Sequence, residues 1–119
     1  MLFRSAYAKS GSIIIKGNAG DGTGGDLNGA SVIVEGNAKY YTASGAKSGS
    51  VTVKGNTGYG TGASLNGASV IVKGAAGNET ASGARSGVIH VGGKSGLGEN
   101  IGENVKIFEA GQQIWPKTK

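Results

Sequence analysis

The chain has 119 residues, which is the length of one ordinary domain. It contains no cysteine and one histidine, so disulfides, thiolate metal centres, iron–sulfur ligation and cysteine nucleophiles are excluded within this chain, and a multi-histidine metal site has too few ligands. The net charge of +5 comes from scattered basic residues with few aromatic residues to stack on bases, so we expect no nucleic-acid partner.

The chain also lacks the features of a membrane or exported protein. No apolar run approaches the roughly 18 residues that span a bilayer. The first residues lack the apolar core of a signal peptide. We therefore expect no membrane partner.

Residues 1–9 precede the regular part of the sequence. We interpret them as an N-terminal cap, in which Leu2, Phe3 and Tyr7 cover the first repeat. Such caps are expected where a repetitive fold ends.

Residues 10–110 are organised as a repeat of 19 residues. Each copy has a short run rich in β-branched residues followed by a glycine, and the glycines are Gly17, Gly36, Gly55, Gly74 and Gly93. A sixth, looser copy is found at 105–107. A second period of 38 residues is superimposed, since Leu-Asn-Gly-Ala-Ser-Val occurs at both 27–32 and 65–70. The pattern indicates duplication of a two-coil unit.

This repeat predicts a β-solenoid. Glycine at this density would destabilise a helix by about 1 kcal/mol at each position, and the leucines are too few for a leucine-rich repeat. Coils of short strands joined by tight bends fit the pattern, with successive coils pairing as parallel strands. We therefore predict an all-β fold, a single-stranded parallel β-helix of about six coils of 19 residues.

The inward columns follow from stacking the copies. Alternating residues of each β-branched run face the core, as do a column of alternating leucine and alanine, a column of small residues and a column of threonines. The columns are 13/15, 32/34, 51/53, 70/72 and 89/91 for the runs, then 27/46/65/84, 19/38/57/76 and 23/42/61/80.

The outward positions of the runs form the first candidate surface. They are Ile14, Ile33, Thr52, Ile71 and His90. A flat apolar sheet face commonly marks an interface. The alternative is that β-branched residues occur there because strands favour them. His90 is interpreted as a surface residue, not a catalyst.

Tyr40, Tyr41 and Tyr59 form the second candidate surface. They fall at equivalent or adjacent positions of one bend. They form either a small aromatic patch for a partner or a cover over the bend.

The glycine-rich segment 20–25 matches the pattern G-x-G-x-x-G. The nucleotide-binding fingerprint requires a strand before it and a helix after it, and no helix or ribose-binding acid is expected here. The repeat itself explains these glycines. Residues 111–119 are interpreted as a C-terminal cap or tail, with Phe108, Ile114, Trp115 and Pro116 covering the last coil.

The segments 17–36 and 55–74, with Gly-Asn-x-Gly-x-Gly-Thr-Gly followed by Leu-Asn-Gly-Ala-Ser-Val-Ile-Val-x-Gly, resemble the GXGXG right-handed β-helix family. That family includes the C-terminal domain of the glutamate synthase large subunit and one of the subunits of formylmethanofuran dehydrogenase. The alternate repeat at 45–53 and the segment 96–100 fit the same family. The resemblance covers roughly residues 10–110 and implies right-handed coiling.

The resemblance implies a non-catalytic scaffold domain or subunit, in a cytoplasmic oxidoreductase complex, that packs against flavin- or amidotransferase-type partners. It carries over no catalytic, cofactor-binding or metal-binding residue, and we expect no activity from the chain alone. A self-assembling structural β-solenoid, forming a homo-oligomer or a filament, is the alternative. An extracellular carbohydrate-binding or adhesive β-helix is the third hypothesis.

Overall fold

Residues 11–116 are described by a computed structural model of the chain. They contain seven strands and no helix. The strands are β1 (Ser12–Ile15), β2 (Asn28–Val34), β3 (Ser48–Val53), β4 (Asn66–Val72), β5 (Ser86–Val91), β6 (Asn104–Glu109) and β7 (Gln112–Trp115).

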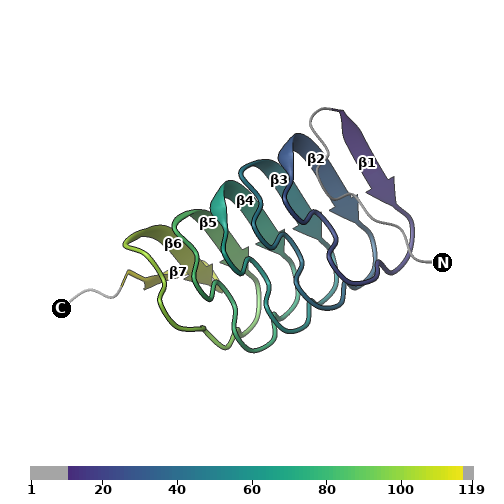
Figure 1. Cartoon of the computed structure of the whole chain (residues 1–119). Helices are drawn as coiled ribbons and strands as arrows, with labels where there is room; N and C mark the ends of the chain where they lie inside the picture. Colours follow the sequence, from purple (N-terminus) through teal and green to yellow (C-terminus); the bar gives the residue numbers. More distant parts are fainter. Residues whose placement is uncertain (1–10, 117–119) are drawn as a thin grey trace.

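The strands form one sheet in chain order. Strands β1 to β6 are parallel, and one full turn of the chain links each to the next (Figure 1). Val32 pairs with Val51 and Val51 pairs with Val70, so residues nineteen apart are neighbours across the sheet. The predicted β-solenoid is confirmed. The number of complete turns is five rather than six, because the chain reverses after β6 into the antiparallel strand β7.

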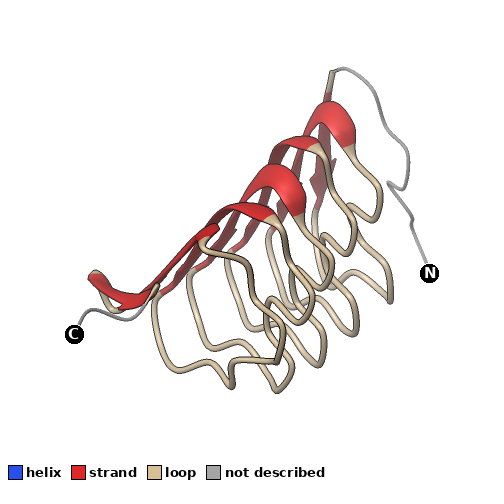
Figure 2. Cartoon of the chain, turned by 60° about the vertical axis from the view of Figure 1, so that its left-hand side comes forward, coloured by secondary structure: helices blue, strands red, loops and turns tan. Residues whose placement is uncertain are grey.

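Each turn contains a single strand, whereas we expected several short strands per coil. Figure 2 shows the strands along one side of the rod and loops along the other sides. The loops still stack by backbone hydrogen bonds between successive turns: Ala19 N donates to Asn37 O at 2.8 Å, and Ala38 N donates to Asn56 O at 3.0 Å. Left-handed residues in these loops, such as Gly22 (φ 76°) and Gly24 (φ 71°), interrupt extended backbone and prevent further strands.

The core lies between the sheet and the loops, and the predicted columns form most of it. Two further columns of buried alanines were not predicted from the sequence, Ala30 with Ala68 and Ala43 with Ala81. Leu27, Ala46, Leu65 and Ala84 are fully or almost fully buried, as are the inward valines of β2, β3 and β4. Ile13 and Ile15 of the first turn are half-buried. The buried threonines satisfy their hydroxyls locally, as where Thr80 Oγ1 donates to Gly77 O at 2.8 Å.

A ladder of asparagine side chains explains three of the glycines that recur every 19 residues, Gly36, Gly55 and Gly74. The Asn37 side-chain oxygen accepts a hydrogen bond from Asn56 N at 2.8 Å, and Asn18 and Asn56 do the same for the turns above them. A Cβ on Gly55 would collide with the Asn37 oxygen. Glycine is therefore required where each asparagine reaches the next turn.

The ends of the rod differ from its middle. The predicted cap at 1–9 lies outside the described residues. At the other end, Ile114 and Trp115 of β7 pack against the core, and Trp115 Nε1 donates to Gly102 O at 2.8 Å. Phe108 does not join them, since it pairs with His90 and lies on the outer face of the sheet. Our expectation that Phe108 caps the core was wrong, because Ile107 occupies the inward position of β6.

Candidate interaction surfaces

The outer residues of the sheet form one continuous ladder. Strand register places them in order along the rod, and we call this set the outer ladder: Ile14, Ile33, Thr52, Ile71, His90 and Phe108. Ile14 and His90 are exposed, and the other four side chains are half-buried by their neighbours. The five residues predicted for this surface are therefore brought together on one side of the molecule.

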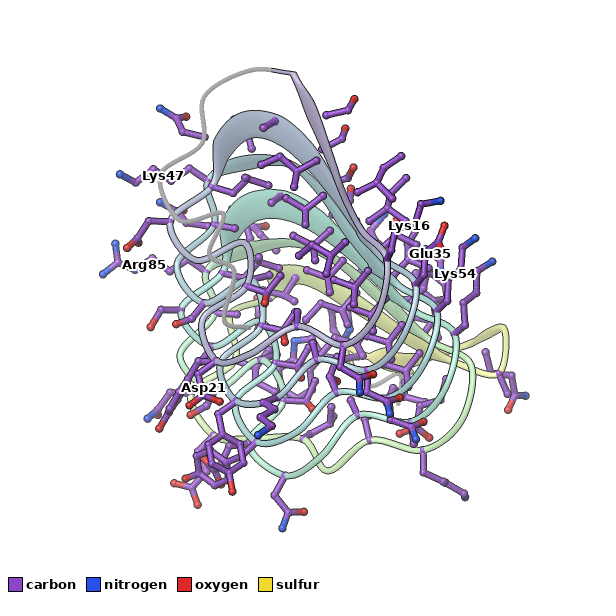
Figure 3. The ribbon with its side chains drawn as sticks, turned by 90° about the vertical axis from the view of Figure 1, so that its right-hand side faces the viewer. Lys16, Asp21, Glu35, Lys47, Lys54 and Arg85 are labelled. Atoms are coloured by element: carbon purple, nitrogen blue, oxygen red, sulfur yellow. The ribbon has the colours of Figure 1, made fainter. Side chains whose placement is uncertain are left out.

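Two polar columns flank the outer ladder. On one side, Ser31 pairs with Ser12 and Ser50 across the sheet. On the other side, just beyond the strand ends, Lys16 forms an ion pair with Glu35 at 3.6 Å, and Lys54 and Lys73 occupy the equivalent positions of later turns. Figure 3, which looks along the rod, shows Lys16, Glu35 and Lys54 projecting from the same edge. The face is thus an apolar stripe with a basic border.

Phe108 extends the outer ladder beyond the predicted residues. Its ring stacks on that of His90, with centroids 4.6 Å apart and an angle of 8° between the ring planes. The sequence could have shown this position. The last repeat has 18 residues instead of 19, so the residue opposite His90 is Phe108. His90 consequently belongs to an aromatic end of the stripe.

The three tyrosines lie elsewhere on the coil. We call them, with Asp21, the tyrosine corner. Asp21 projects from the corner away from Lys16 and Lys54 (Figure 3), and its carboxylate accepts a hydrogen bond from Tyr40 N at 3.2 Å. The Tyr41 and Tyr59 rings meet edge to face, with centroids 5.9 Å apart. All three rings are about half exposed.

Two shallow hollows adjoin the tyrosine corner. The larger, of about 440 Å³, is lined by Asp21, Asn37, Ala38, Lys39, Tyr40, Asn56, Thr57 and Gly58. The smaller, of about 210 Å³, is lined by Tyr41, Tyr59, Gly60, Ala63, Ser64, Glu79 and Ser82. The groups that line the two hollows are aromatic rings, hydroxyls, amides, carboxylates and the Lys39 ammonium.

Residues 11–116 hold no group of three or more histidine or acidic side chains placed to bind a metal ion. The glycine-rich segment 20–25 forms turns and leads into β2. It therefore lacks the helix whose N-terminus binds phosphate in a nucleotide fold. Within this part of the chain, no helix has the length and apolar character to cross a membrane.

Comparison with protein-family models, with curated proteins and with solved structures found no match in any of the three.

Proposed function

We propose that the chain is a non-catalytic scaffold whose outer ladder docks against a protein partner. The outer ladder itself carries the proposal. Six apolar or aromatic positions, counting Thr52 for its methyl group, lie in register on one flat face with a basic border. Contiguous apolar surface rimmed by polar residues is typical of an interface.

The size of the face favours a partner larger than a second copy. Six strands at about 4.8 Å spacing and about five residues of 3.3 Å each give a face of about 500 Å². A stable interface buries about 800 Å² on each partner. The face of about 500 Å² already includes the serine and lysine columns, so a partner reaches that area only by also contacting surface beyond the sheet. The resemblance to the GXGXG family suggests a flavin- or amidotransferase-type subunit of an oxidoreductase complex in the cytoplasm.

Lateral self-association through the same face is the second candidate. The outer ladder repeats at one spacing, so a second copy placed beside it with the same rod direction matches its rungs, with the lysine column of one opposite the serine column of the other. End-to-end growth is less favoured because β7 pairs with β6 in the antiparallel direction and occupies the edge that a further coil would use.

The docking proposal is tested by crosslinking. A photoreactive residue replaces Ile33 on the outer ladder or, as control, Asn66, which is exposed at the start of β4 away from the outer ladder. In the source cells we expect the residue at 33 to crosslink a flavin- or amidotransferase-type subunit identified by mass spectrometry. If the residue at 33 crosslinks only to another copy of this chain, self-association is favoured. If neither position forms a crosslink, both candidates are contradicted.

A charged substitution on the outer ladder, compared with the same substitution elsewhere, tests whether the ladder is needed to bind the partner. Ile33→Lys places an ammonium group within the apolar stripe and should abolish capture of the partner while leaving the melting temperature within a few degrees of the native value. Asn66→Lys adds the same charge away from the stripe and should capture normally. Equal capture by the two variants would remove the outer ladder from the interface.

A further inference from the structure

The tyrosine corner is a preformed aromatic platform. A Cβ on Gly60 would lie 2.5 Å from Cδ1 of Tyr41, and a Cβ on Gly58 would lie 3.1 Å from Cδ1 of Tyr40. The Tyr40 and Tyr41 rings therefore lie against the glycine backbone of the next turn. Rings held in this way present exposed surface without losing further freedom when a ligand binds.

The backbone at Tyr41 is strained. Tyr41 adopts φ 61°, in the left-handed region that a bulky side chain rarely enters. The equivalent residues of the two adjacent turns are Gly22 (φ 76°) and Gly60 (φ 80°), which adopt it freely. Glu79 (φ 62°), two turns from Tyr41, is strained in the same way, and both side chains line the smaller hollow. Ala43 (φ 62°) and Ala81 (φ 66°) alternate with left-handed glycines in the same way, so this backbone belongs to the repeat, and at Tyr41 and Glu79 it places the side chains at the smaller hollow.

The hollows beside the rings offer fixed hydrogen-bonding groups. The side-chain oxygens of Asn37 and Asn56 accept backbone N–H groups at 2.8 and 2.9 Å, which orients both amides. Their NH₂ groups form no hydrogen bond within residues 11–116 and remain available as donors. The Lys39 ammonium adds a donor, and the Asp21 carboxylate adds an acceptor. The second hollow adds Glu79 and two serine hydroxyls.

We propose that the tyrosine corner binds a neutral oligosaccharide along the rod. A pyranose ring has an apolar C–H face that stacks on an aromatic ring and a rim of hydroxyls that both donate and accept hydrogen bonds. The two hollows supply both kinds of partner on either side of the rings. Asp21 and Lys39 balance each other in the larger hollow, and among residues 11–116 Glu79 is the one charged residue that lines the smaller hollow, so together the two hollows do not favour the phosphates of a nucleic acid or the carboxylates of an acidic glycan.

Isothermal titration calorimetry tests this site. The probes are neutral tetrasaccharides of glucose, mannose, galactose and N-acetylglucosamine, with tetragalacturonate and a thymidine dodecanucleotide as anionic comparisons. We expect at least one neutral tetrasaccharide to bind at millimolar concentration or below and more tightly than either anion. Binding of no neutral tetrasaccharide, or tighter binding of either anion, overturns the proposal.

Variants locate the binding. Tyr59→Ala should weaken the bound tetrasaccharide about tenfold, the loss expected when one stacked ring is removed. Tyr41→Gly removes a ring and also relieves its backbone, so it should weaken binding while the melting temperature stays the same or rises. Ile33→Lys, on the outer ladder, should bind normally. If Tyr41→Gly and Tyr59→Ala bind like the native chain, the site is not at this corner.

Discussion

At the scale of single residues, the fold depends on what lies nineteen positions away. The asparagine ladder joins turns through side chains, and glycine is needed above each asparagine. Gly17 and Gly55 occupy the same column, but among residues 11–116 only Gly55 of the two has an asparagine side chain beneath it, and a Cβ on Gly17 would meet no atom of these residues within 4 Å. Substituting alanine at each of the two positions therefore distinguishes the cost of a clash with the neighbouring turn from the cost of replacing glycine as such.

We predict that Gly55→Ala destabilises the chain by about 2 kcal/mol, because the added methyl must displace the Asn37 oxygen or the backbone of Gly36. Gly17→Ala should change stability by less than about 0.5 kcal/mol. Urea denaturation monitored by circular dichroism measures both. Equal effects of the two substitutions would show that the asparagine ladder does not determine the glycine spacing.

At the scale of elements, β7 is the part that ends the solenoid. It covers the edge of β6, and its Trp115 both packs on the core and donates to Gly102 O. An uncovered β6 would present unpaired backbone groups beside the buried Val105 and Ile107. Open edges of this kind promote association.

We predict that ending the chain after Gly111, which removes β7, lowers the free energy of unfolding by about 3 kcal/mol through lost burial. It should also cause association that increases with concentration. Ending the chain after Pro116 removes only 117–119 and should do neither. Light scattering coupled to size-exclusion chromatography measures the mass. A monodisperse, equally stable chain ending at Gly111 would show that β7 is not a cap.

The elements that could be predicted from sequence are those with a strong period. Alternation in runs such as Val32–Val34 sets both the strand and its inward face, and repetition sets the register. The reversal into β7 could not be predicted, because it occurs once and carries no period. The left-handed backbone of the loops could not be predicted at positions such as Tyr41 and Glu79, because these residue types rarely adopt it. The placement of Tyr40 and Tyr59 in one column followed from their spacing of 19. The flat seating of the rings and the hollows depend on side-chain torsions that the spacing does not determine.

At the scale of the whole molecule, the chain is a stack of coils with a period of 19 residues. Both proposed surfaces exist only because equivalent residues of successive turns meet: the outer ladder on the sheet and the tyrosine corner on the loops. Asp21 of the tyrosine corner and the lysines beside the outer ladder lie on different sides of the coil (Figure 3), so the two proposals together predict that an oligosaccharide does not compete with a protein partner.

Disulfide formation between introduced cysteines measures this stacking directly, since the chain has no cysteine of its own. Thr52 and Ile71 are neighbours on adjacent parallel strands, about 4.8 Å apart, whereas Thr52 and His90 are two strands apart, about 10 Å. A disulfide requires Cα atoms closer than about 7 Å. The double variant Thr52→Cys with Ile71→Cys should therefore form an intramolecular disulfide under mild oxidation, and Thr52→Cys with His90→Cys should not. Failure of the first pair, or equal bridging by the second, would contradict the stacked coil.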